Sequence, residues 1–387
     1  MAKYKIILLP GDGIGPEVMA EAEKILDTIS STGSAEFELT EFPCGYSYFY
    51  KTGVPSPEGM FEACKTEADA ILLGAVGDIS GNNTKPRLEW LSPGGKVVFG
   101  LRAGLDLYAN VRPVKLYPNI KHRISHEFVQ VWQPENVNLV IVRENIEGLY
   151  ANVMAAARGN SGVERIKLGD RIEEPRLTTE AGSRRIIEFA FEHSLRRTDG
   201  APMDNKKRVT CVDKSNVLVG CKLFRTIYND IAERYPMVQK DYAYIDSFVQ
   251  WLLRRPENYN IVVMSNLFGD IVTDQAAVLQ GGMGMAPSGN IGAAHAMFEP
   301  VHGAAPKYEG KNVANPIGMI LSVKMMLDWL GDRKSDPELF SAGKKLEEAV
   351  VDVLQNGETL TADIGGKATC SDVGNAVSEK LYELFSN

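Results

Sequence analysis

Five short, almost wholly apolar runs alternate along this chain with longer segments of helical periodicity. The apolar runs span residues 5–9, 70–74, 139–142, 208–212 and 259–264. Runs of this length and composition are typical of strands that are buried on both faces of a sheet. Helical patterns cover residues 16–29, 179–192, 221–233, 316–330 and 337–354. The alternation predicts an α/β protein with helices flanking a sheet.

A chain of 387 residues is long for one core, which predicts about two domains or one two-lobed unit. No linker rich in glycine, serine or proline separates two halves, and no internal repeat is present. We therefore expect lobes that share crossing connections and are discontinuous in sequence. Residues 156–176 are charged and weakly periodic, which indicates either a surface loop or an arm that pairs with another subunit.

The overall charge argues against two classes of partner. The formal net charge is -8 at neutral pH, and a mildly acidic protein is a poor ligand for nucleic acid or an anionic membrane. Five cysteines without a CxxC pair indicate reduced, mostly buried thiols. No signal peptide and no apolar span near twenty residues is evident, so we expect a cytoplasmic protein. A presequence cleaved from a longer precursor stays open.

A glycine-rich turn, Gly11-Asp12-Gly13-Ile14-Gly15, joins the first predicted strand to the first predicted helix. Its position resembles that of a dinucleotide fingerprint, but its spacing is GxGxG and not GxGxxG. A tight structural turn and a nucleotide contact both stay open for it.

Three aspartates suggest a metal site. Asp270 and Asp274 are four residues apart, so on a helix their carboxylates share one face. Mg²⁺ and Mn²⁺ prefer such oxygen ligands, whereas the alternative is a solvated acidic helix start. Asp246 lies among largely apolar residues, where an unpaired buried carboxylate would be costly.

Three arginines are candidates for binding carboxylates. Arg102 and Arg112 flank the sequence AGLDLYANV, and Arg143 follows the apolar run 139–142. Arginine binds carboxylates through two parallel hydrogen bonds, so three arginines beside a metal site suggest a di- or tricarboxylate. Tyr150 and Lys214 are possible proton carriers, although each is equally compatible with an ordinary packing or surface role.

A turn of small residues follows Glu299, and its backbone amides could approach a ligand closely. His302 could stack on an adenine or cap the loop, and Lys307 could hold a phosphate or be a surface charge. The candidate cofactor residues, with Ile14 of the glycine-rich turn added, are Ile14, Glu299, His302, Gly303, Ala304, Ala305, Lys307, Tyr308 and Asn315.

Taken together, these motifs resemble the isocitrate and 3-isopropylmalate dehydrogenase family of β-decarboxylating dehydrogenases over nearly the whole chain. The segments that carry the resemblance are LLPGDGIGPEV, LDLYANVRPVK, IVRENIEGLY, VDKSNVL, SNLFGDIVTDQAAVLQGGMGMAPSGNIG and FEPVHGAAPKYEGKNVANP. The resemblance implies oxidation of a (2R)-hydroxy acid by hydride transfer to NAD or NADP, followed by loss of CO2. It implies a two-lobed fold of mixed sheets flanked by helices, with residues 1–107 and 281–387 forming a large cofactor-binding lobe. Residues 108–280 would form a smaller lobe that dimerises, and the active site would lie in the cleft between the lobes.

The resemblance also assigns roles. Asp270, Asp274 and the partner subunit's Asp246 would hold Mg²⁺ or Mn²⁺, which makes a homodimer the functional minimum and leaves a tetramer open. Lys214 of the partner subunit resembles the base at the hydroxyl, and Tyr150 resembles the acid that protonates the enolate carbon. The substrate-binding set is Val98, Phe99, Arg102, Arg112 and Arg143. The cofactor would lie on the loop that begins at His302.

The choice of dinucleotide depends on Lys307 and Tyr308. Family members that use NAD usually carry an aspartate in place of Lys307, whereas those that use NADP carry this Lys-Tyr pair, so NADP is favoured. Residues 360–366 lack the tyrosine and arginine that bind the phosphate in some NADP enzymes and look more like NAD-type members.

The substrate depends on the residues before Arg102. Isocitrate enzymes place a serine and an asparagine there, and homoisocitrate enzymes can place an arginine. Val98 and Phe99 cannot pair a third carboxylate and suit an alkyl group, which favours 3-isopropylmalate or a related 3-substituted malate. Typical isopropylmalate enzymes carry a glutamate and two leucines where this chain has Gly95, Val98 and Phe99, so D-malate, tartrate and homoisocitrate stay open. Isocitrate is the alternative if Lys96 turns inward.

Two hypotheses come from other classes. A non-catalytic regulatory subunit of this family would lack catalytic residues, yet Tyr150, Lys214 and the three aspartates are all present. A metal-binding scaffold would explain the aspartates but not the three arginines.

Overall fold

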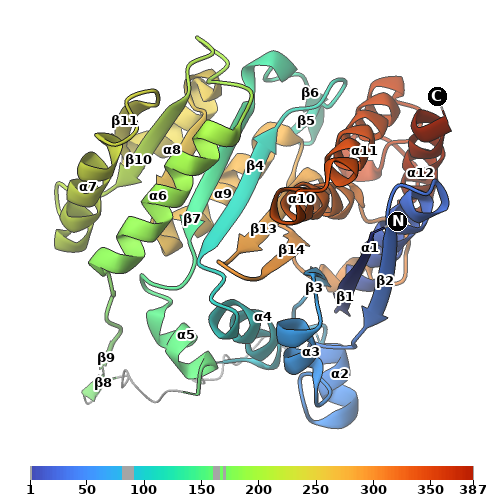
Figure 1. Cartoon of the computed structure of the whole chain (residues 1–387), viewed down its shortest axis with the longest axis horizontal. Helices are drawn as coiled ribbons and strands as arrows, with labels where there is room; N and C mark the ends of the chain where they lie inside the picture. The colour runs from blue at the N-terminus through green and yellow to red at the C-terminus, as the bar shows by residue number, and fades with distance from the viewer. Residues whose placement is uncertain (1, 81–90, 160–165, 169–170, 387) are drawn as a thin grey trace.

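The computed structural model describes residues 2–80, 91–159, 166–168 and 171–386. Within them, ten strands form one mixed sheet in the order β11-β10-β12-β7-β4-β13-β14-β3-β1-β2, with helices on both of its faces (Figure 1). The α/β fold predicted from the alternating pattern is confirmed.

The strands of the large sheet are β1 (Lys3–Gly11), β2 (Glu36–Glu41), β3 (Ala70–Ala75), β4 (Ala109–Lys115), β7 (Asn138–Glu144), β10 (Arg208–Asp213), β11 (Gln239–Tyr244), β12 (Ile261–Met264), β13 (Pro287–Ile291) and β14 (Ala296–Pro300). Two separate hairpins are β5 (His122–Ile124) with β6 (Glu127–Val129), and β8 (Ile166–Leu168) with β9 (Arg171–Glu173). The helices are α1 (Gly15–Ser31), α2 (Tyr46–Thr52), α3 (Met60–Thr66), α4 (Pro93–Gly104), α5 (Ala151–Ala157), α6 (Glu180–Arg196), α7 (Val219–Ala232), α8 (Ile245–Arg254), α9 (Asn266–Ala277), α10 (Ile317–Lys334), α11 (Pro337–Asn356) and α12 (Cys370–Ser386).

The middle of the sheet is where segments far apart in the sequence meet. β13 runs antiparallel to β14 on one side and to β4 on the other, and β4 runs antiparallel to β7. The outer strands on both sides pair in parallel. β13 therefore joins a half made of β3, β1 and β2 to a half made of β7, β12, β10 and β11.

The apolar run of β1 is buried on both faces, as predicted. Ile6 and Leu8 pack with α1, α10, α11 and α12 in one core cluster, whereas Ile7 and Leu9 pack with α3 and α4 in another. Alternate residues of a strand project to opposite faces, so an unbroken apolar run serves two cores. Figure 1 shows α10 and α11 lying beside this half of the sheet.

The other half repeats this arrangement with different helices. Val140 and Val142 of β7 pack with α6 and α7, whereas Leu139 and Ile141 contribute to the core that includes α8 and α9. The apolar runs of β7, β10 and β12 are each fully buried.

The glycine-rich turn is tight, while a nucleotide contact through Ile14 stays a prediction. Gly11 and Gly13 have φ angles of 77° and 59°, in the left-handed region that favours glycine. A Cβ on Gly13 would lie 2.0 Å from the carbonyl oxygen of Ala304, and the Ile14 N–H donates to that same oxygen at 2.9 Å. The turn therefore holds the loop that contains His302.

Several smaller expectations can also be compared with the structure. All five cysteines are free and buried, as predicted. No helix among the described residues is long and apolar enough to cross a membrane. Segment 156–176 contains the β8–β9 hairpin, apart from the main sheet (Figure 1); its residues 160–165 and 169–170 lie outside the described residues, and its pairing with another subunit stays a prediction.

Candidate active site

Three arginines that are distant in sequence come together with buried side chains. Arg102 lies in the last turn of α4, Arg112 in β4 and Arg143 in β7. Their exposed fractions are 7%, 7% and 1%. β4 and β7 are adjacent strands, and the charges of the three guanidinium groups act on one another. The structure therefore brings the three arginines together, while their role in binding a carboxylate stays a prediction.

Arg143 is fixed by the start of α9. Its Nε and Nη2 donate to Asn266 Oδ1 at 3.0 and 2.7 Å, and its Nη1 pairs with Asp270. Met264 of β12 lies directly beside Arg143 of β7 in a parallel pair. The residues that follow β12 therefore meet the end of β7, because parallel strands end at the same edge of a sheet.

Tyr150 binds the other oxygen of the Asp270 carboxylate. Its hydroxyl donates to Asp270 Oδ2 at 2.8 Å. The turn between Arg143 and Tyr150 is held by Glu144, whose carboxylate accepts the N–H groups of Ile146 and Glu147 at 3.0 and 2.7 Å. Burial and the hydrogen bond to Asp270 raise the pKa of the Tyr150 phenol, so it keeps its proton at neutral pH.

Arg112 pairs with the next turn of α9. Its Nη1 donates to Thr273 Oγ1 at 2.5 Å and to Asp274 Oδ1 at 3.2 Å. Asp270 and Asp274 thus lie on one face of α9, as their spacing predicts. Burial raises the pKa of Asp270, but the charge of Arg143, the hydrogen bond from Tyr150 and the charges of Arg112 and Arg102 together outweigh burial and hold that pKa below its usual value.

Arg102 is held by Glu299 from β14. Arg102 Nη2 donates to Glu299 Oε1 at 2.8 Å, and only 13% of the Glu299 side chain is exposed. Glu299 was predicted to be a cofactor residue; its described partners are Arg102 and Asn290.

The positive charge of this site is buried more deeply than the negative charge. The side chains of Asp270 and Asp274 are 36% and 59% exposed, against 1% and 9% for the arginines they pair with. Burial, together with the charges of Arg102 and Arg112, lowers the pKa of Arg143 to about 10. Burial and Arg102 also lower the pKa of Arg112. An anion that entered among these groups would counter the mutual repulsion of the arginines.

Phe99 lies one helical turn before Arg102 on α4. Its ring meets the ring of Tyr150 edge-on with centroids 6.2 Å apart, and the Arg102 guanidinium lies 5.8 Å from the Phe99 centroid. Val98 is half-buried and packs against the core beneath α3 and α4. Lys96 is exposed.

Lys214 and Asp246 meet each other and not the other two aspartates. Lys214 Nζ lies 2.6 Å from Asp246 Oδ1, and each residue follows the end of one of two adjacent parallel strands, β10 and β11. Our expectation that Asp246 is buried among apolar residues is wrong, because its side chain is 62% exposed. The apolar residues near Asp246 lie on other faces of α8, where Phe248 and Leu252 are buried in the core. In the described part of one chain, no three acidic, histidine or cysteine side chains are grouped closely enough to hold a metal ion.

The loop after β14 is partly open. Ala304 is buried against the glycine-rich turn, whereas Gly303, Lys307 and Tyr308 are exposed. Lys307 Nζ lies 4.6 Å from the centroid of the Tyr308 ring. The His302 Nε2 atom is buried and has no partner among the described residues. Asn315, at the end of this loop, is buried, and its Nδ2 donates to Asp363 at 3.1 Å.

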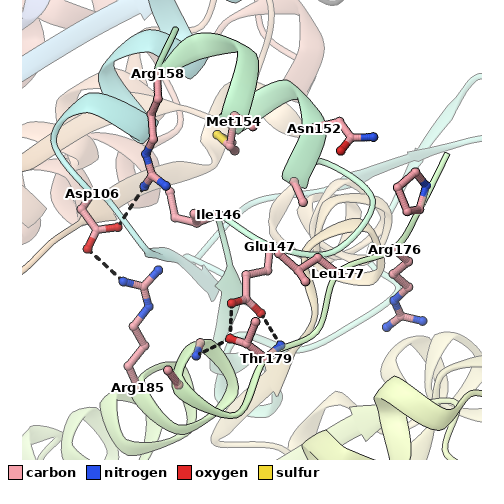
Figure 2. Close-up of a pocket in the computed structure, with 15 residues that line it drawn as sticks. Asp106, Ile146, Glu147, Asn152, Met154, Arg158, Arg176, Leu177, Thr179 and Arg185 are labelled. Atoms are coloured by element: carbon pink, nitrogen blue, oxygen red, sulfur yellow. Dashed lines mark hydrogen bonds and ion pairs between the residues drawn. The ribbon is translucent and has the colours of Figure 1, made fainter. Parts of the chain in front are cut away.

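A cavity of about 570 Å³ lies between α5 and α6 (Figure 2). On one of its walls Asp106 accepts from Arg158 at 3.4 Å and from Arg185 at 2.9 Å. On another wall, Glu147 accepts the Thr179 N–H at 2.9 Å. The three site arginines are absent from its described lining, and its acidic groups are paired within the protein.

The sequence profile of the isocitrate/isopropylmalate dehydrogenase family matches residues 5–377. The chain belongs to this family. Among its relatives, homoisocitrate dehydrogenase of Methanocaldococcus jannaschii is 37% identical over 377 residues, which cover 96% of each chain. The 3-isopropylmalate dehydrogenase of Aquifex aeolicus is 37% identical over 386 residues, covering 99% of this chain and 97% of the relative.

Solved structures agree with this membership. The isocitrate dehydrogenase of Methylococcus capsulatus superposes with a TM-score of 0.79 at 31% identity and covers 98% of this chain, with 99% of its own chain matched. A β-decarboxylating dehydrogenase of Thermococcus kodakarensis gives a TM-score of 0.73 at 35% identity, with 99% of this chain and 97% of that chain covered. The protein is thus an enzyme of the isocitrate/isopropylmalate dehydrogenase family, a family of metal-dependent β-decarboxylating dehydrogenases.

Reasoning from the sequence missed three residues of this family member's site. Asn266 anchors Arg143, Thr273 accepts from Arg112, and Asn290 donates to Glu299. Asn266 and Thr273 stand inside the quoted segment SNLFGDIVTD, so their position beside the aspartates was a usable signal. Asn290 stands near the end of the same quoted family segment, but its partners Asn110, Asn145 and Glu299 come from other strands, so the segment did not indicate its role.

Proposed function

We propose that this enzyme oxidises a 3-substituted malate of the isopropylmalate type to a 2-keto acid and CO2. The single observation that carries the substrate class is the contact of Phe99 with both Tyr150 and Arg102. An aromatic ring at this position offers apolar surface to the C3 substituent and no partner for a third carboxylate. The three arginines supply partners for the two carboxylates of the malate part.

The residues support a defined sequence of proton movements. Lys214 of the partner subunit would take the proton of the C2 hydroxyl as the hydride leaves C2 for the nicotinamide ring. Loss of CO2 then leaves the electron pair on C3, and the Tyr150 phenol would donate its proton there. The raised pKa of Tyr150 suits a group that must stay protonated until that step.

The aspartates fit a divalent cation only if two chains combine. Asp270 and Asp274 present carboxylate oxygens on one face of α9, and the exposed Asp246 would be supplied by the partner subunit. Mg²⁺ or Mn²⁺ held there would stabilise the negative charge that develops on the substrate oxygen. Exposed apolar side chains near these elements support a subunit interface: Ile271, between the two aspartates, is 60% exposed, and Val219 at the start of α7 is 78% exposed.

We propose NADP as the preferred dinucleotide, bound on the loop from His302 to Asn315. The exposed Lys307 and Tyr308 present an ammonium and a phenol that would favour a 2′-phosphate. Residues 1–107 with 281–387 would form one lobe and residues 108–280 the other. The sheet supports this division, since its two halves meet at the β4–β13 pair.

The first experiment is a matrix of initial rates. Purified enzyme with Mg²⁺ or Mn²⁺ is assayed with 3-isopropylmalate, isocitrate, D-malate and homoisocitrate, each with NAD and NADP. We expect turnover of the alkyl or unsubstituted malates. Preferred turnover of isocitrate would refute the apolar pocket and point to Lys96 as the partner of a third carboxylate, and dependence on the cation is checked by adding EDTA.

A mixing experiment tests the shared site. Lys214→Met and Asp270→Asn variants are each expected to be inactive and folded. If each site combines Lys214 of one subunit with Asp270 of the other, a re-equilibrated mixture should recover about a quarter of the wild-type rate, because half of the random dimers regain one intact site. A mixture that stays inactive while hybrid dimers are seen by native mass spectrometry would contradict the shared site.

A further inference from the structure

A cluster of three buried asparagines lies behind Arg102 and has no part in the proposed chemistry. Asn110, Asn145 and Asn290, which we call the asparagine cluster, each have an exposed fraction of 0%. Asn110 and Asn145 both donate from Nδ2 to Asn290 Oδ1, each at 3.0 Å. Asn290 in turn donates from Nδ2 to Glu299 Oε1 at 2.7 Å. The same Glu299 oxygen accepts Arg102 Nη2 at 2.8 Å.

Strand register explains why these side chains meet. Asn290 of β13 lies directly opposite Asn110 of β4, which lies directly opposite Arg143 of β7. Glu299 of β14 lies opposite Ser288, two residues before Asn290. Directly opposite residues of antiparallel strands project to the same face, as do residues two apart on one strand. One polar face in the middle of the sheet therefore runs from Arg143 through the asparagines to Glu299.

The hydrogen bonds of this row all point the same way. Amide groups donate to an amide oxygen, that amide donates to the carboxylate, and the carboxylate accepts from Arg102. Such a chain aligns its dipoles toward the Glu299 carboxylate and fixes the oxygen that Arg102 uses. Asn110 lies in β4, and Asn145 directly follows β7, in one half of the sheet. Glu299 lies in β14 of the other half, and Arg102 lies in α4.

Stability alone is a poor explanation for the asparagine cluster. Asn110 Oδ1 and Asn145 Oδ1 are buried without a partner among the described residues. An unpaired buried acceptor is unfavourable, and apolar side chains of similar size would pack the middle of a sheet without that cost. A polar row that is imperfectly satisfied yet ends on a substrate-binding arginine is better explained by the position it gives that arginine.

We propose that Asn290, supported by Asn110 and Asn145, is a positioning residue that acts through Glu299 to set the guanidinium of Arg102 for the carboxylate of the hydroxy acid. Glu299 is accordingly an anchor of the acid site and not a cofactor ligand. This inference rests on the proposed role of Arg102 in binding the acid.

Kinetics of Asn290→Ala test the assignment. Removing the donor to Glu299 should raise KM for whichever acid the wild type turns over best by about tenfold, because a misplaced arginine loses binding in ground and transition state alike. kcat and KM for the dinucleotide should change less than about threefold on the same reasoning. Glu299→Gln, which keeps the size of the side chain and one acceptor oxygen, should shift the same parameter in the same direction.

Asn260→Ala is the matched control. Asn260 is equally buried and also bonds backbone groups, donating to Asp199 O and accepting from Arg208 N, at 3.2 and 3.4 Å. It lies immediately before β12, outside the site. This variant should lose stability but keep the wild-type KM for the acid, which separates positioning from a general loss of packing.

A double-mutant cycle decides whether Asn290 acts through Arg102. Acid binding in the presence of Mg²⁺ is measured by titration calorimetry for Asn290→Ala, Arg102→Ala and the double variant. We expect Asn290→Ala to add no further loss in the Arg102→Ala background, since the two residues serve one contact. Additive losses, or a rise in KM for the dinucleotide instead of the acid, would overturn the proposal.

A crystal structure of Asn290→Ala separates this inference from the proposed function. If the wild type turns over none of the four acids, the proposed function has failed, but the position of Arg102 can still be read. Displacement of the Arg102 guanidinium from Glu299 supports the positioning role. An Arg102 that stays on Glu299 as in the wild type overturns it, whatever the substrate.

Discussion

Two groups of charged side chains in this protein contrast sharply, one buried and one half-buried. One is the active-site group of Arg102, Arg112 and Arg143 with its carboxylates. The other, which we call the helix network, lies between β4 and the helices α10 and α11 and consists of Lys115, Tyr117, Lys324, Asp328 and Glu347. Both combine several cations and carboxylates, but the pKa of Lys324 is raised whereas the pKa values of Arg112 and Arg143 are lowered.

In the helix network the protein satisfies its own charges. Glu347 pairs with Lys115 at 2.7 Å and with Lys324 at 3.3 Å, and Lys324 also pairs with Asp328 at 2.8 Å. Burial lowers the pKa of Lys324, but Asp328 and Glu347 outweigh burial and raise it overall. No side-chain atom of these five residues is both buried and unpaired in the part of the chain that the structure describes.

In the active site each of the three arginines pairs with one carboxylate, but the guanidinium groups are not fully satisfied. Burial and neighbouring arginines lower the pKa values of Arg112 and Arg143, and the Nε atoms of Arg102 and Arg112 are buried without a partner among the described residues. The contrast teaches that buried arginines with depressed pKa values and unpaired N–H groups mark a site for an anion, whereas charges that satisfy one another connect elements of the fold.

The largest effect is expected from a comparison of two cations on β4, Arg112 of the active site and Lys115 of the helix network. Arg112→Met should lower kcat/KM by at least about 10³-fold, because it removes a buried partner of the substrate carboxylate. Its free energy of unfolding should change by less than about 1 kcal/mol, because the lost bonds to Thr273 and to the exposed Asp274 are offset by the removal of a buried guanidinium that other arginines repel. Steady-state kinetics and urea unfolding measure the two quantities.

Lys115→Met is the matched variant, three residues further along β4. It should reduce stability and leave kcat/KM unchanged. Equal effects of the two substitutions on stability and activity would erase the distinction between the two groups.

The contribution of the helix network to the free energy of unfolding should depend on pH. Burial raises the pKa of Glu347, but Lys324 and Lys115 outweigh burial and lower it from 4.5 to about 2. A carboxyl with a depressed pKa in the folded state stabilises above the pKa of the unfolded state and loses that contribution as the pH falls. Glu347→Gln should therefore lose about 3 kcal/mol at pH 7.

That difference should be constant above about pH 5 and shrink as the pH falls from about 4.5 toward 2. Urea unfolding of wild type and variant at a series of pH values measures it. A difference that does not depend on pH would show that the effect is one of packing and not of charge.

The apolar edge of the active site should have a smaller effect. Phe99→Ser should lower kcat/KM for the preferred alkylmalate by about 30-fold, the cost expected for losing most of an apolar contact of this size. Activity toward D-malate, which lacks the C3 substituent, should fall much less. Phe340→Ser, an exposed phenylalanine on α11, is the control, and equal losses for both acids would argue against Phe99 as the selective contact.

The smallest effect is expected for an exposed cation. Lys307 is exposed and lies over Tyr308, so water screens its charge in a way that it cannot screen the buried arginines. Lys307→Asp should shift the ratio of kcat/KM for NADP over NAD toward NAD by about tenfold. An unchanged ratio would place the dinucleotide phosphate elsewhere.

The sequence by itself determined the layers of this protein and the chemistry of its site. The apolar run 5–9 predicted a strand buried on both faces, and the spacing of Asp270 and Asp274 predicted two carboxylates on one helix face. Both followed from local periods of two and 3.6 residues, which the backbone geometry fixes. Arginines, a tyrosine and aspartates in quoted family segments were enough to predict the grouping around Tyr150.

Only the tertiary structure decided which strands are neighbours, and with them the partners of each charge. The exposure of Asp246 was misjudged because its apolar neighbours turn to the core on other sides of α8. The bond of Glu299 to Arg102 and the row from Asn110 to Asn290 depend on the register of β4 with β13, strands about 180 positions apart in the chain. Pairings over such separations leave no local pattern, because register is selected by the packing of the whole sheet.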